Sequence, residues 1–169
     1  ILALAKQLFF LDGSIRDDNF KARRLNLPID VDGKTLGLIG CGGIGRLAAQ
    51  KCRLGFNMKV LGYDPYLKTA PEGIELVKDI EDISRQSDFI SIHLPLTDET
   101  RNMINAETLT KFKPGAILIN TSRGGIVDEA ALAAALNSGQ IAGAGLDVFS
   151  QEPVPMESPL LQAKNLIMT

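Results

Sequence analysis

The sequence has 169 residues, which suits one domain with a substantial core and leaves no room for a second full domain. Its net charge of −2 and its scattered basic residues argue against a nucleic-acid surface and against a patch for acidic membranes. No apolar run is long enough to span a bilayer and no leader with a small-residue cleavage site is present, so we expect a cytoplasmic protein that binds neither nucleic acid nor membrane.

The cysteines and the histidine indicate neither a disulfide framework nor a metal site. The chain has two cysteines, Cys41 and Cys52, and one histidine, His93. Metal sites need clustered ligands, and small disulfide-rich proteins need more cysteines. We therefore expect no bound metal and regard both thiols as small packing residues.

The chain begins with a helical pattern. Residues 1–11 are predicted to form a helix, and one apolar stripe consists of Leu4, Leu8, Leu11 and Ile15. Two partners for this stripe stay open: the flank of the same domain or a second subunit. Residues 12–28 are polar and are predicted to be irregular, and Asp32 and Gly33 turn the chain into the first strand.

A glycine-rich turn follows that strand. Residues 35–45 read TLGLIGCGGIG, in which Gly40, Gly42 and Gly45 fit the pattern G-x-G-x-x-G. Between a strand and a helix, these glycines permit a tight turn, let backbone approach a pyrophosphate, and let the helix pack on the strand. Amides at the start of the helix then face the anion. The helix is predicted to bury Ile44, Leu47, Ala48 and Cys52 and to end at Gly55.

An acidic residue completes this dinucleotide pattern. The second apolar run, residues 58–63, ends at Asp64, which lies 19 residues beyond Gly45. A carboxylate at this distance accepts hydrogen bonds from the adenosine ribose. It disfavours a 2′-phosphate, because two like charges at about 4 Å repel by roughly 4 kcal/mol at an effective dielectric constant near 20. The sequence therefore predicts NAD rather than NADP. The alternative for Asp64 is a solvated residue at the strand end.

Strands and helices alternate along the rest of the chain. Further strands are predicted at residues 74–77, 88–94, 116–120, 141–148 and 165–168. Helices are predicted to follow the N-cap residues Asp79, Asn105 and Asp128 and to end at Gln86, near Phe112 and before Gly139. This alternation predicts an α/β fold, a Rossmann-type doubly wound parallel sheet with strand order 3-2-1-4-5-6-7 and helices on both faces.

The predicted topology brings several loops to one edge of the sheet. In such folds ligands bind beyond the carboxyl ends of the strands at the topological switch point. The segments that follow those ends are residues 40–45, Asp64, and residues 94–100, 121–123 and 147–152, and we expect them to line one crevice. Arg123 lies between a strand end and two glycines, so it either points into this crevice or forms a nearby ion pair.

Four segments in order resemble the D-2-hydroxyacid dehydrogenases, a family that includes 3-phosphoglycerate, glyoxylate and formate dehydrogenases. They are GCGGIG with Asp64, SIHLPLTDET, INTSRGGIVDE and GAGLDVFSQEP. The resemblance covers nearly the whole chain. It implies that residues 1–169 are an NAD-binding domain, with a leading helix and connector at 1–30, a Rossmann core at 31–169 and a substrate domain outside the chain. The implied protein is a homodimeric NAD-dependent oxidoreductase that transfers hydride between NADH and a small 2-keto acid.

The resemblance also implies a role for each matching residue. Backbone at Gly43 and Ile44 meets the pyrophosphate and Asp64 binds the ribose. Leu94, Pro95 and Thr100 flank the adenosine side, Thr121, Ser122 and Arg123 approach the nicotinamide half, and Asp147 bonds near the carboxamide. Arg123 holds the substrate's carboxylate and carbonyl, and Glu152 pairs with a histidine that acts as general acid and base. The simpler alternatives are a structural ion pair for Arg123, a loop cap for Asp147 and a solvated carboxylate for Glu152.

Two features depart from the family's pattern. The family's histidine belongs to a Pro-His pair after the last strand, and this chain stops at Thr169, where that pair would begin. His93 is interpreted as a strand-end residue with a structural role. Gly43 stands where relatives often carry a longer polar residue. Both ends resemble cuts from a longer protein, and without the histidine we expect cofactor binding with poor turnover.

The alternatives to a 2-hydroxyacid dehydrogenase are an NAD-sensing, corepressor-like protein without turnover and a formate- or phosphonate-oxidising relative. The sequence does not identify the 2-hydroxy acid.

Overall fold

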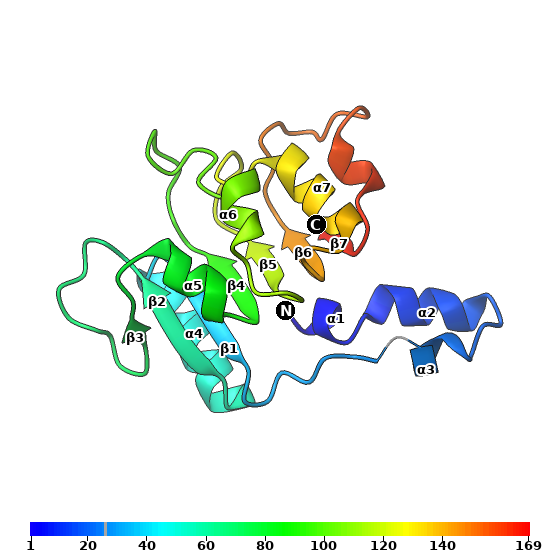
Figure 1. Ribbon diagram of the computed structural model, residues 1–169, viewed down its shortest axis with the longest axis horizontal. Coiled ribbons are helices and arrows are strands. Elements are labelled where there is room, and N and C mark those ends of the chain that lie inside the picture. The colour runs from blue at the N-terminus through cyan, green and yellow to red at the C-terminus, as the bar shows by residue number, and fades with distance from the viewer. Residues whose placement is uncertain (26) are drawn as a thin grey trace.

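The core of the molecule is a parallel β-sheet (Figure 1). The computed structural model describes residues 1–25 and 27–169, and in this part the sheet has seven strands in the order β3-β2-β1-β4-β5-β6-β7. The strands are β1 (Thr35–Ile39), β2 (Lys59–Tyr63), β3 (Glu75–Leu76), β4 (Phe89–Ile92), β5 (Ile117–Asn120), β6 (Gly143–Leu146) and β7 (Leu166–Met168). Neighbouring strands pair in parallel. The predicted fold class and strand order are confirmed.

Helices cover both faces of this sheet, as predicted. One face carries α5 (Ile80–Gln86), α6 (Ala106–Thr110), α7 (Glu129–Ser138) and the short 3-10 helix η1 (Pro159–Gln162), whose apolar side chains share one core with the sheet. The other face carries α1 (Leu2–Ala5) and α4 (Gly43–Phe56), which belong to a second core. Strand β1 feeds both cores, because Leu36 and Leu38 face α4 and Ile39 faces the opposite side.

The three predicted helix caps are confirmed. The side chains of Asp79 and Asn105 accept hydrogen bonds from backbone N–H groups three residues later, at 2.9 and 3.0 Å. Asp128 accepts from two amides at the start of α7, each at 3.0 Å. Helix α7 ends before Gly139, whose φ of 77° is a left-handed conformation that suits glycine.

Helix α4 differs from its prediction in its end and in its buried face. It continues through Gly55 to Phe56, and Asn57 ends it in the left-handed conformation at φ 51°. Of the predicted face, Cys52 is buried and Ala48 is half-buried, whereas Ile44 and Leu47 are 67% and 53% exposed. Gly45 and Ala49 are buried in addition. Close packing of Gly45 on the glycine turn sets the rotation of the helix, which directs the larger apolar residues outward.

The N-terminal segment also differs from its prediction. The expected helix over residues 1–11 is broken at Gln7, whose φ of 50° separates α1 from α2 (Leu8–Arg16). Residues 12–28 are not uniformly irregular, because α2 continues through an Asp12–Arg16 ion pair of 2.7 Å and α3 spans Ala22–Leu25. Asn26 lies outside the described residues.

The two short helices α1 and α2 use the predicted apolar stripe differently. Leu4 of α1 packs on β6, where β-carbons at Gly143 and Gly145 would lie 3.1 and 3.4 Å from its methyl carbons. Helix α2 buries none of its own residues in the described chain, and Ile15 is 55% exposed. Figure 1 shows α2 and α3 projecting from the body of the domain, and we call residues 8–25 the N-terminal arm.

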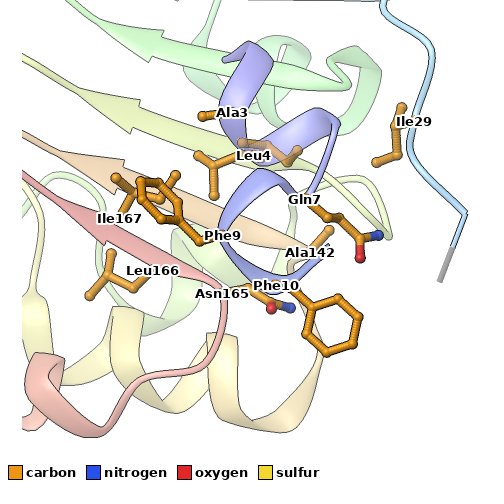
Figure 2. Close-up of a pocket in the computed structure, with 11 residues that line it drawn as sticks. Ala3, Leu4, Gln7, Phe9, Phe10, Ile29, Ala142, Asn165, Leu166 and Ile167 are labelled. Carbon is orange, nitrogen blue, oxygen red and sulfur yellow. The ribbon is translucent and has the colours of Figure 1, made fainter. Parts of the chain in front are cut away.

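A pocket of about 360 Å³ lies where this arm leaves the sheet. Figure 2 shows Phe9 turned toward Leu166 and Ile167 of β7, while Phe10 points away from them. The pocket lies at the amino ends of β5 to β7, the sheet edge opposite the predicted crevice. Among residues 1–25 and 27–169, no helix combines the length and the apolarity needed to cross a bilayer.

Candidate functional site

The glycine turn joins β1 to α4 and leaves its front open. Gly40 has a φ of 95°, and a β-carbon there would lie 2.7 Å from the carbonyl oxygen of His93. A β-carbon at Gly45 would lie 2.4 Å from the carbonyl oxygen of Gly40, whereas Gly42 and Gly43 face open space. In the part of the chain that the structure describes, no side chain caps the start of α4, so the first N–H groups of this 14-residue helix face that space. The turn therefore fits a dinucleotide pyrophosphate.

Asp64 lies beside this turn, at the carboxyl end of β2. One carboxylate oxygen accepts a hydrogen bond from Cys41 N at 3.0 Å and the other from Tyr66 N at 3.1 Å. Each oxygen keeps a further lone pair that can accept from a ribose hydroxyl. Asp64 is thus held facing the glycine turn, as the dinucleotide pattern requires.

Arg46 strengthens the same turn, and the sequence analysis did not identify it. Its Nε donates to the carbonyl oxygen of Cys41 at 2.8 Å. Burial, followed by the negative charge of Asp64, raises the pKa of the Cys41 thiol to about 11, and the positive charge of Arg46 offsets part of this rise. The only sign of this contact in the sequence was the position of Arg46 directly after Gly45, the last glycine of the pattern.

A cleft of about 260 Å³ connects the turn with the ends of β4 and β5. Its lining residues are Ile44, His93, Leu94, Pro95, Thr121, Ser122 and Arg123. Six of these seven were predicted site residues, and the seventh, His93, was predicted to have a structural role. The structure therefore brings the start of α4, the end of β4 and the Thr121–Arg123 loop together.

The loop that carries Arg123 is fixed by Asn120, a residue that the sequence analysis did not assign to the site. Asn120 is 1% exposed, and its side-chain oxygen accepts from Ser122 N at 3.1 Å and from Ser122 Oγ at 2.8 Å. Its amide nitrogen donates to the carbonyl oxygen of Arg123 at 3.0 Å. Within the described residues the Arg123 guanidinium forms no ion pair and donates only to the carbonyl oxygen of Ser122, at 2.6 Å. The guanidinium is thus available to a ligand in the cleft.

His93 makes local contacts that agree with its structural interpretation. Its Nε2 lies 3.0 Å from Ser91 Oγ, and burial lowers the pKa of its imidazole. The neutral ring therefore forms part of the cleft wall at the end of β4. Among residues 1–25 and 27–169, no group of three His, Cys, Asp or Glu side chains is placed to hold a metal ion.

Three predicted site residues lie outside both this cleft and the glycine turn with its neighbour Asp64. The Thr100 hydroxyl donates to the carbonyl oxygen of Pro95 at 2.8 Å and so closes the turn after β4. Asp147 accepts from Thr169 Oγ1 at 2.8 Å and, with Thr121, lines a separate hollow of about 150 Å³. Glu152 accepts from Phe149 N at 3.0 Å, within its own loop. The sequence placed all three at the correct sheet edge, and the loop conformations turn their polar atoms to partners nearby.

Comparison with known proteins gives one consistent family. Residues 1–169 match the family model described as D-isomer specific 2-hydroxyacid dehydrogenase, NAD binding domain. Glyoxylate reductase of Korarchaeum cryptofilum is 43% identical over 174 residues, covering 99% of this chain and 52% of that protein. D-3-phosphoglycerate dehydrogenase of Mycobacterium tuberculosis is 42% identical over 172 residues, covering 100% of this chain and 32% of that protein. The chain thus spans about half or less of the length of these relatives.

A solved structure shows the same arrangement of elements. The NAD-dependent formate dehydrogenase of Staphylococcus aureus, in complex with NAD, superposes with a TM-score of 0.93 at 30% identity. The match covers 99% of this chain and 51% of that one. The chain therefore belongs to the D-isomer specific 2-hydroxyacid dehydrogenase family, as its NAD-binding domain.

Proposed function

We propose that this domain serves an NAD-dependent oxidoreductase that transfers hydride between NADH and a small 2-keto acid. The observation that carries the proposal is the single cleft lined both by the start of α4 and by Arg123, whose guanidinium has no acidic partner among the described residues. The nicotinamide ring supplies the hydride when it is bound. Relatives named as reductases and dehydrogenases favour turnover over NAD sensing alone. A substrate domain in the rest of a longer protein completes the site.

The cofactor contacts in this proposal follow the chain around the cleft. Backbone at Gly43 and Ile44 binds the pyrophosphate and Asp64 binds the adenosine ribose. Leu94 and Pro95 flank the adenosine side, with Thr100 holding Pro95 in place through its hydroxyl. The nicotinamide half lies against Thr121 and Ser122, with Asp147 near its carboxamide.

Two residues carry the polar chemistry of the substrate. Arg123 presents two parallel N–H donors, which suit a carboxylate and the adjacent carbonyl of a 2-keto acid. As the carbonyl gains negative charge during reduction, a fixed cation stabilises it. Glu152 orients a general acid from outside this chain, because a nearby carboxylate favours a protonated partner at neutral pH.

The test uses the full-length protein with NADH and a panel of small 2-keto acids. We expect Arg123→Ala to lower kcat/KM for the best substrate by about 10²-fold or more, since it removes the cation at the reacting oxygen. The affinity for NADH should change less than threefold. The control is Arg85→Ala, which removes an arginine that pairs with Glu81 on α5 far from the cleft. Unchanged kcat/KM in Arg123→Ala would contradict the role of Arg123.

We also propose that the protein is a homodimer assembled through the N-terminal arm. The arm exposes Leu8, Phe9, Phe10, Ile15 and Phe20, and an apolar surface of this kind marks an interface. A projecting arm can lie in the pocket at the base of a second copy's arm, and a two-fold axis makes the exchange reciprocal. Two buried free thiols support a cytoplasmic location.

A further inference from the structure

The loop after β6 carries Glu152, and two carboxylates hold its backbone. Phe149 N donates to Glu152 Oε1 at 3.0 Å, and the next amide, Ser150 N, donates to Glu129 Oε1 at 2.6 Å. Glu129 comes from a different part of the chain, because it is the first residue of α7. Hydrogen bonds to a charged acceptor are among the stronger ones in proteins. Glu129 thus ties the loop to a packed helix.

The same stretch of backbone rests on Gly124 on its other side. A β-carbon at Gly124 would lie 1.7 Å from the carbonyl oxygen of Phe149 and 2.8 Å from Ser150 N. This approach requires glycine next to Arg123. The Phe149–Ser150 peptide is therefore held between the loop that carries Arg123 and the helix that carries Glu129.

Helix capping does not explain the position of Glu129. Asp128 caps α7 with its own carboxylate, through the amides of Ala130 and Ala131. Glu129 is half-buried, and it reaches away from the helix to Ser150. Leu132 and Leu136 anchor the same helix in the core, so its first turn is a rigid base.

We propose that Glu129 is a positioning residue that sets the orientation of Glu152 through the Phe149–Ser150 backbone. Glu152 uses one oxygen within the loop, and its other oxygen has no partner among the described residues. With Glu129 in place, the loop that carries this free oxygen is held against Gly124, the residue after Arg123. The inference rests on the proposed function, in which Glu152 orients the general acid.

The kinetic test compares three variants of the full-length protein. Glu129→Ala removes the acceptor, Glu129→Asp withdraws it by one methylene, and Glu129→Gln keeps a neutral oxygen for Ser150 N. We expect kcat for 2-keto acid reduction to fall roughly tenfold to a hundredfold in Glu129→Ala and Glu129→Asp, because small misplacements of reacting groups cost rates of this size. Glu129→Gln should stay within about threefold of the wild type, and KM for NADH should be nearly constant throughout.

The pH dependence of kcat distinguishes a loss of Glu152 positioning from a general loss of structure. A displaced Glu152 raises the pKa of the general acid less, so the acid loses its proton at a lower pH. The alkaline limb of kcat for reduction should therefore move to lower pH in Glu129→Ala and stay in place in Glu129→Gln. The control is Glu107→Ala, which removes a carboxylate from the first turn of α6 that pairs with Lys111. A fall in kcat without movement of the alkaline limb would overturn the proposal.

Hydrogen exchange on the same proteins tests the contact without activity. The peptide that covers residues 147–153 should exchange faster in Glu129→Ala than in the wild type, Glu129→Gln or Glu107→Ala. A wild type that reduces no 2-keto acid would reject the proposed function, and this exchange difference would still report on the loop. Exchange in Glu129→Ala equal to the wild type would overturn the role of Glu129.

Discussion

Asp64 is oriented by backbone on both of its carboxylate oxygens. Its bonds to Cys41 N and Tyr66 N hold it at the glycine turn with no cofactor contact required. The sequence predicted the position of Asp64, because the spacing from Gly45 places it at the end of the neighbouring strand. Preorganisation of this kind lowers the entropic cost of binding.

Removing the charge of Asp64 should weaken the choice between the two dinucleotides. In Asp64→Asn the side-chain oxygen still accepts from Cys41 N, and the repulsion of a 2′-phosphate is lost. Asp64 is half-buried, so solvent screens part of that repulsion. We expect the ratio of NADPH to NADH dissociation constants to fall about tenfold, measured by titration calorimetry. The same ratio in wild type and Asp64→Asn would show that the carboxylate does not discriminate.

Other residues of the site were beyond sequence analysis because their roles depend on loop conformation. Asn120, Arg46 and Glu129 each bond to a backbone group whose position follows only from the folded loops. The same limit applies to Glu152 and Asp147, whose sheet edge was predicted and whose present partners were not.

Helix α4 shows that apolar periodicity predicts the presence of a helix better than it predicts which face is buried. The helix and its start were predicted from the glycine pattern and the apolar residues. The prediction of its buried face was right for Cys52 and wrong for Ile44 and Leu47, because close backbone packing at Gly45 outweighs the burial of those two side chains. Capped helices were predicted well, since Asp79, Asn105 and Asp128 act locally. The break at Gln7 has no comparable local signal, and the sequence analysis missed it.

Two glycines of α4 provide a matched pair for testing this packing. Gly45→Ala puts a methyl group against backbone, and we expect it to lower the free energy of unfolding by about 2 kcal/mol or more and to weaken NADH binding. Gly55→Ala faces open space within the helix and should raise that free energy by about 0.5–1 kcal/mol. Urea unfolding of both variants measures the difference. Equal stability of the two would contradict close packing at Gly45.

At the scale of the whole molecule, the α/β architecture follows from the alternation of strands and helices. Right-handed crossovers and burial of both sheet faces leave few arrangements of such a chain. The packing of the N-terminal segment was harder to predict, because its apolar residues could pack either on the same domain or on a second subunit. In the structure α1 covers the domain's own flank, while α2 leaves most of its apolar side chains exposed.

The exposed arm leads to a prediction about assembly. The double change Phe9→Asp with Phe10→Asp places two charges in the proposed interface and should convert a dimer of the full-length protein to a monomer at micromolar concentration. Light scattering after size-exclusion chromatography measures the mass. The control is Met156→Asp, an exposed apolar residue off the arm, which should leave the mass unchanged. A dimer that survives the double change would place the interface elsewhere.

Both thiols of the chain are buried in the core that α4 shares with the sheet, Cys41 within the glycine turn and Cys52 on the inner face of α4. Burial raises the pKa of each thiol, so near neutral pH neither carries much of the thiolate that alkylating reagents attack. The native protein should consequently resist iodoacetamide. The rate at which iodoacetamide labels the two cysteines then measures how often the nucleotide-binding half opens, so these thiols report on local unfolding.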